Sequence, residues 1–81
     1  MVKLYTSDQC TICKQVLSAM GGEAGAAQLG VQVMNMSIDA AANQEGRALG
    51  MRSMPGLAEN GQLTASGGGV AVRLRQLGLL R

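Results

Sequence analysis

The chain has 81 residues and a formal net charge of +2 at pH 7, and it contains two cysteines but no histidine, tryptophan or phenylalanine. This length allows one small domain, so we expect residues 1–81 to form a single folding unit. The lack of histidine excludes a Ser-His-Asp triad, a Cys-His pair and any imidazole ligand for zinc, and the small charge gives no reason to expect a nucleic-acid partner.

The first predicted elements are a strand and a helix that meet at the two cysteines. Val2–Thr6 is short, alternating and β-rich, which is typical of a strand. After a polar loop, apolar residues recur at the spacing of one helix face, at Ile12, Val16, Leu17 and Met20. Cys10 therefore begins a helix, where free backbone N–H groups and the positive dipole end favour a thiolate, and Cys13 follows about one turn later.

A second strand and a second helix are predicted in the middle of the chain. A Gly-Gly pair interrupts the first helix, and residues 23–29 form a short Ala-rich continuation. Residues 31–38 predict a strand whose broken alternation suits a parallel strand covered on both faces. Residues 39–49 predict a helix with its N-cap at Asp39. The first half thus predicts two parallel strands with a right-handed crossover.

The second half predicts a β-hairpin and a last helix. The dipeptide Asn60-Gly61 is a strong hairpin signal, flanked by strands at 56–59 and 62–65. A glycine-rich turn follows, and then a helix marked by Val70, Leu74 and Leu77. The predicted order is β-α-β-α-β-β-α, which belongs to the α/β class.

The segment Cys10-Thr11-Ile12-Cys13 admits four interpretations. A structural zinc site needs about four ligands, and this chain offers two thiolates and no imidazole. A structural disulfide over so short a loop would stabilise the fold by only about 2 kcal/mol, and a cytosol would keep it reduced. Both thiols could also be inert and buried. We favour a redox dithiol, because the pair lies at a strand-to-helix junction.

The whole chain resembles the thioredoxin superfamily, and most of all its short glutaredoxin branch. The resemblance rests on Cys-x-x-Cys at a helix start and on a proline about forty residues later, just before a hairpin. Ser53-Met54-Pro55 stands where that branch has Thr-Val-Pro, and Ala65-Ser66-Gly67 is similar to the Ser-Gly segment of NrdH-type redoxins, which donate electrons to ribonucleotide reductase. The resemblance implies a glutaredoxin-like fold with a mixed four-stranded sheet flanked by helices.

The same resemblance implies a thiol–disulfide oxidoreductase that reduces protein disulfides. Cys10 would be the nucleophile and Cys13 the resolving cysteine. Pro55 would be cis and would face the dithiol, while Met54 would offer its backbone to the substrate. We also expect substrate contacts at four residues outside this set, namely Thr11, Ile12, Gly67 and Gly68. The other interpretation of Gly67 and Gly68 is a flexible connection before the last helix.

The expected partner is a disulfide-containing protein, with a thioredoxin-reductase-like flavoprotein or glutathione as the reductant. We expect no tightly bound cofactor and no metal. The redox-active group would be the disulfide itself. Glutathione is disfavoured because Ser7 replaces the family's usual lysine and because no aspartate follows Gly67 and Gly68. The middle pair Thr11-Ile12 also departs from the usual Pro-Tyr.

Three other functions stay open at this point. The first is a glutathione-dependent glutaredoxin. The second is a dimeric iron–sulfur or metal-binding module, which needs four sulfur ligands and therefore two chains. The third is a structural or inhibitory role without turnover. No basic-then-apolar leader and no run of 18 apolar residues occurs, so we expect a cytoplasmic monomer that does not enter a membrane.

Overall fold

A four-stranded mixed sheet forms the centre of the fold. A computed structural model describes residues 1–80, and in these residues the strands are β1 (Val2–Thr6), β2 (Val31–Asn35), β3 (Gly56–Glu59) and β4 (Gln62–Ser66). They lie in the order β2-β1-β3-β4, with β1 parallel to β2 and the two other pairs antiparallel. The α/β class and the mixed sheet are as predicted, and they are consistent with a thioredoxin-like fold.

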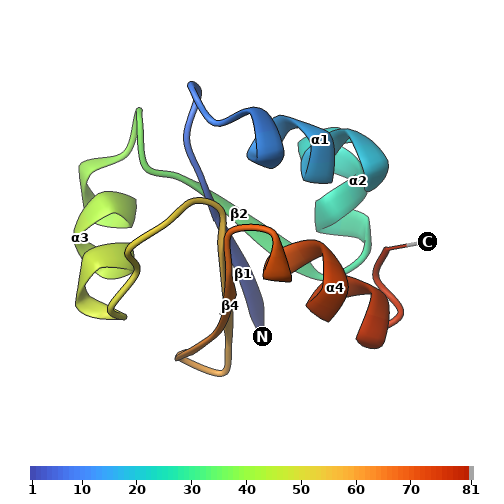
Figure 1. The fold of residues 1–81 in the computed structure, drawn as a ribbon. Coiled ribbons are helices and arrows are strands. Elements are labelled where there is room, and N and C mark those ends of the chain that lie inside the picture. Colours follow the sequence, from blue (N-terminus) through green and yellow to red (C-terminus); the bar gives the residue numbers. More distant parts are fainter. Residues whose placement is uncertain (81) are drawn as a thin grey trace.

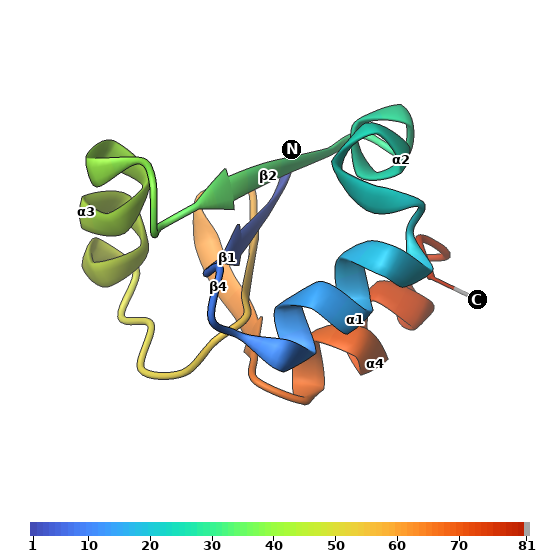
Figure 2. The same ribbon diagram turned by 90° about the horizontal axis from the view of Figure 1, so that it is seen from above.

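Helices cover both faces of this sheet. They are α1 (Thr11–Ala19), α2 (Gly22–Gln28), α3 (Ala40–Ala48) and α4 (Gly69–Gln76). Figures 1 and 2 show α1, α2 and α4 on one side of the sheet and α3 on the other. The core lies mainly on the three-helix side, where the fully buried side chains include Leu4, Leu57, Val70 and Leu74.

The Ala-rich continuation of the first helix is a separate helix, α2, so the predicted element order lacked one element. Gly21 and Gly22 adopt φ angles of 91° and 78°, in the left-handed region that glycine enters without steric cost. The chain therefore turns after α1 and starts again. Gly25 of α2 lies so close to the end of α1 that an added Cβ would be 2.1 Å from the carbonyl oxygen of Met20.

The second predicted strand ends earlier than expected and lies at the edge of the sheet. β2 ends at Asn35, whose Oδ1 accepts a hydrogen bond from the backbone N–H of Ser37 at 2.9 Å. Such a turn gives the backbone an alternative to the strand ladder. Ile38, which was predicted to belong to the strand, is 78% exposed. β2 is parallel to β1, as predicted, and α2 and α3 contact it from opposite sides of the sheet, but it is an edge strand and most of its residues are only half-buried.

The other local signals are confirmed. Asp39 caps α3, because its Oδ1 accepts from the backbone N–H groups of Ala41 and Ala42 at 3.0 and 3.3 Å. Asn60 and Gly61 both have positive φ angles, 54° and 83°, as a two-residue hairpin turn requires.

A buried tyrosine ties α3 to the sheet. Tyr5 of β1 is fully buried, and its hydroxyl donates to Glu45 Oε1 at 2.7 Å. Lys3 Nζ donates to the same oxygen at 2.5 Å. Burial, and then the bond to the carboxylate, raises the pKa of Tyr5 well above its ordinary value. The hydrogen bonds from Lys3 and Tyr5 lower the pKa of Glu45.

In the part of the chain described here, no helix is long and apolar enough to cross a membrane.

An ion pair joins the hairpin to the last helix. Arg73 Nε and Nη2 of α4 donate to the two carboxylate oxygens of Glu59 at 2.8 and 2.9 Å. Thr64 also donates to Glu59. These hydrogen bonds, with that of Arg73 first, lower the pKa of Glu59 from 4.5 to about 2. The same pair raises the pKa of Arg73.

A Glu59→Gln variant should be less stable than the native chain at neutral pH, and the difference should disappear in acid. The folded-state pKa is lowered, so the carboxylate stabilises the fold above the unfolded-state pKa near 4.5, and this contribution is lost as the pH falls toward 2. Melting temperatures of both proteins between about pH 2 and pH 7 measure the effect. A gap in melting temperature that stays constant over this range would contradict the assignment.

Candidate redox site

The segments that contain the predicted site residues meet at one edge of the sheet. Tyr5 of β1 pairs with Gly56 of the antiparallel β3, so the chain after β1 and the chain before β3 meet at the same edge. Gly56 also pairs with Ser66, so the segment after β4 begins there too. The topology therefore brings the dithiol loop, Pro55 and Gly67 to one edge, which can be followed in Figures 1 and 2.

The two cysteines form a disulfide at the start of α1. Their Cα atoms are 5.2 Å apart, within the range that a disulfide needs. Cys10 is the N-cap of α1, and its Sγ accepts a hydrogen bond from the backbone N–H of Cys13 at 3.1 Å. Cys13 is only 1% exposed, whereas Cys10 is partly exposed. A bulky disulfide can therefore approach the sulfur of Cys10 far more easily than that of Cys13.

Pro55 lies at the sheet edge with the peptide geometry that the resemblance implied. The Met54–Pro55 bond is cis, and Pro55 is fully buried. The carbonyl of Pro55 accepts a hydrogen bond from the backbone N–H of Gly67 at 2.7 Å. Gly67 has a φ of 60° and so occupies the left-handed region. This bond ties Gly67 to Pro55.

The remaining predicted contact residues lie around the start of α1. Ile12 is 42% exposed and lines a groove of about 340 Å³ that is also lined by Gly68, at the N-cap of α4. Thr11 is the exposed first residue of α1, next to Cys10. The structure thus brings Ile12 and Gly68 together, on the surface beside the dithiol.

A polar network that the sequence did not reveal holds the loop before Cys10. Asn35 Nδ2 donates to Asp8 Oδ1 at 2.8 Å, and the backbone N–H of Asp8 donates to Ser37 Oγ at 3.0 Å. The hydroxyls of Ser7 and Ser37 are 3.1 Å apart. The available signal was the parallel pairing of β1 and β2, which puts the turn residues that follow both strands at one edge.

A cavity of about 330 Å³ reaches the buried cysteine from the other side of α1. Asp8, Cys13, Lys14 and Glu23 contribute to its lining. The charges closest to the dithiol in the sequence, Asp8 and Lys14, thus line the same cavity, with opposite effects on a thiolate. Across residues 1–80 no three His, Cys, Asp or Glu side chains are grouped so that they could hold a metal ion.

No protein-family model matches the sequence, and no curated protein shows significant similarity to it. The functional argument therefore rests on the fold, on the cysteine pair and on the residues that surround it.

Proposed function

We propose that the protein is a thiol–disulfide oxidoreductase that reduces disulfides in other proteins. The observation that carries the proposal is a Cys-x-x-Cys pair, close enough for a disulfide, with the partly exposed Cys10 capping a helix and Cys13 buried behind it. The helix N-terminus favours the thiolate, which is the reactive form of cysteine.

In the reduced protein, the Cys10 thiolate attacks one sulfur of the partner's disulfide. A mixed disulfide forms, and the partner's other sulfur leaves as a thiolate that takes up a proton. Cys13 then loses its proton and attacks Cys10 Sγ. The Cys10–Cys13 disulfide forms, and the partner's second thiolate leaves. The partner has gained two electrons and this protein has lost two. The N–H of Cys13, which donates to Cys10 Sγ, would stabilise negative charge on that sulfur in the first step.

Pro55 and the residue before it would position the substrate. Pro55 is at the same sheet edge as Cys10, and Met54 is only partly buried there. Met54 lies before the first residue of β3, so an extended substrate segment could hydrogen-bond to its backbone groups. Ile12 and Gly68 would contact the substrate on the other side of the dithiol.

The return of the protein to its reduced form needs an external reductant, for which we propose a thioredoxin-reductase-like flavoprotein. The resemblance to the electron donors of ribonucleotide reductase makes the disulfide of that enzyme one partner to try. The flavoprotein is favoured over glutathione because Ser7 replaces the lysine that is usual in glutaredoxins and because no aspartate follows Gly68.

A coupled assay tests the function and the reductant together. The oxidised protein is mixed with NADPH and a disulfide-containing protein such as insulin, with either thioredoxin reductase or glutathione plus glutathione reductase. We expect NADPH consumption that depends on this protein and is faster with thioredoxin reductase. Turnover only with glutathione would show that glutathione, and not the flavoprotein, is the reductant. No turnover in either system, together with no reduction of insulin by protein that has been chemically reduced beforehand, would refute the reductase function.

A further inference from the structure

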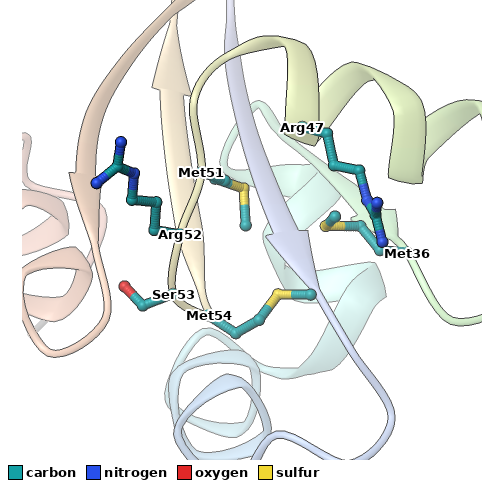
Figure 3. Close-up of a pocket in the computed structure, with 6 residues that line it drawn as sticks. All are labelled: Met36, Arg47, Met51, Arg52, Ser53 and Met54. Carbon is teal, nitrogen blue, oxygen red and sulfur yellow. The ribbon is translucent and has the colours of Figure 1, made fainter.

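A groove lined by methionines lies beside the dithiol edge. Its volume is about 340 Å³, and we call it the methionine groove, defined by Met36, Arg47, Met51, Arg52, Ser53 and Met54. Figure 3 shows the three methionine side chains gathered around the hollow, which lies between α3 and the loop before β3. Methionine side chains are flexible and polarisable, so such a surface adapts to different apolar side chains.

Two glycines make room for the methionines of this groove. A Cβ added at Gly56 of β3 would lie 2.3 Å from Met51 Sδ, and one added at Gly46 would lie 3.0 Å from Met36 Cε. Gly46 is in the interior of α3, where glycine costs about 1 kcal/mol relative to alanine. The helix therefore carries an unfavourable residue at the point where Met36 packs against it.

The charged groups around the methionine groove are all positive. Among residues 1–80 no carboxylate lines the groove. The ion pairs found in the same part of the chain join Lys3 to Glu45 and Arg73 to Glu59, so neither Arg47 nor Arg52 is paired. Figure 3 shows the guanidinium of Arg47 reaching from α3 to a position beside Met36, while Arg52 projects from the other side of the loop.

The methionine groove is continuous with the dithiol edge. Met54 directly precedes Pro55, and Pro55 is the last residue before β3 at that edge. Met36 follows β2, and its backbone N–H donates to the carbonyl of Thr6, the last residue of β1, at 2.8 Å. A protein segment that presents its disulfide to Cys10 can therefore extend across Met54 toward Arg47.

We propose that the methionine groove binds a segment of the partner protein in which an acidic side chain lies close to an apolar one, near the disulfide. The apolar side chain contacts Met36, Met51 and Met54, and the carboxylate pairs with Arg47, with Arg52 as a second cation at the rim. This inference rests on the proposed reductase function and adds a preference among its substrates. A groove with unpaired cations and no carboxylate attracts an acidic segment and disfavours a basic one.

Three synthetic peptides with one internal disulfide provide the test. The first carries Leu and Asp beside one cysteine, the second has Asn in place of Asp, and the third has Ser in place of Leu. We expect kcat/KM for the Asp peptide to exceed that for the Asn peptide about three- to fivefold at low ionic strength, and the preference to shrink in high salt. The Ser peptide should also be reduced less efficiently than the Leu peptide.

Two variants with the same change in net charge separate a local contact from general electrostatics. Arg47→Gln should remove the preference, so that kcat/KM becomes about equal for the Asp and Asn peptides. Gln32→Glu, on the exposed surface of β2 away from the dithiol edge, should keep the preference.

Equal kcat/KM for the Asp and Asn peptides with the native protein would overturn the inference while the reductase function stands. A preference that survives Arg47→Gln, or one that Gln32→Glu removes as well, would also overturn it. If no peptide and no protein disulfide is reduced at all, the proposed function itself fails.

Discussion

A Cys13→Ser variant should remain covalently joined to its partner after one attack. Cys10 can still form the mixed disulfide, but no second thiol is available to resolve it. Incubation of the reduced variant with an oxidised partner should give an adduct that reducing agent releases and that mass spectrometry assigns to Cys10. Steady-state reductase activity should fall by roughly 10³-fold or more, as when other enzymes lose a residue that reacts covalently.

The matched Cys10→Ser variant separates the roles of the two thiols. It should form little adduct, because Cys13 is only 1% exposed and lies within the first turn of α1. It should also lose turnover to a similar extent. An adduct through Cys13 in this variant, at a rate like that of Cys10 in the other, would reverse the assignment of nucleophile and resolving cysteine.

A Gly25→Ala variant should lose about 3 kcal/mol of unfolding free energy and more than about 10 °C in melting temperature. The added Cβ would lie 2.1 Å from the backbone carbonyl oxygen of Met20 and 2.9 Å from its carbonyl carbon. Backbone atoms cannot move aside as the end of a side chain can, so α2 would have to shift away from α1. Alanine favours a helix by about 1 kcal/mol over glycine, which offsets only part of this cost.

Gly69→Ala is the matched control for this substitution. Gly69 is the first residue of α4, and an added Cβ there meets no atom within 4 Å. This variant should be as stable as the native chain, or more stable by about 0.4–1 kcal/mol, because alanine restricts the unfolded chain. Thermal melts followed by circular dichroism compare the variants. Equal melting temperatures for Gly25→Ala and the native chain would show that α1 and α2 are less tightly packed than described.

The sequence by itself determined the elements whose causes are local. The periodicity after Cys10 predicts α1, the Asp39 side chain caps α3 within its own first turn, and Asn60-Gly61 forms the hairpin turn with the positive φ angles that these residue types favour. The placement of Cys10 at a helix N-terminus, three residues before Cys13, is local as well. That is why the cysteine pair, the centre of the proposed function, could be identified before any fold was known.

The end of β2 and the separation of α2 from α1 did not follow from the hydrophobic pattern. Residues 31–38 alternate with one break, as a covered strand can, but the side chain of Asn35 bonds to the backbone of Ser37 and ends β2 early. The edge position of β2 follows from which strands pair, and no pattern within the strand encodes it. Within the sequence, Gly25 is only an unfavourable residue for a helix. The structure explains it, because the backbone carbonyl of Met20 leaves no room for a side chain there.

Only the tertiary structure decided what surrounds the dithiol. Pro55 and Gly67 reach the edge that carries Cys10 because β3 pairs antiparallel with β1, which is far away in the sequence, and β4 pairs back onto β3 through the hairpin. The methionine groove joins Met36, Arg47 and Met54 from three different segments. The sequence alone specifies the cysteine pair at a helix terminus, because that placement is a local feature. It leaves the proposed binding surface to the fold, because that surface is built from residues that meet only when the sheet forms.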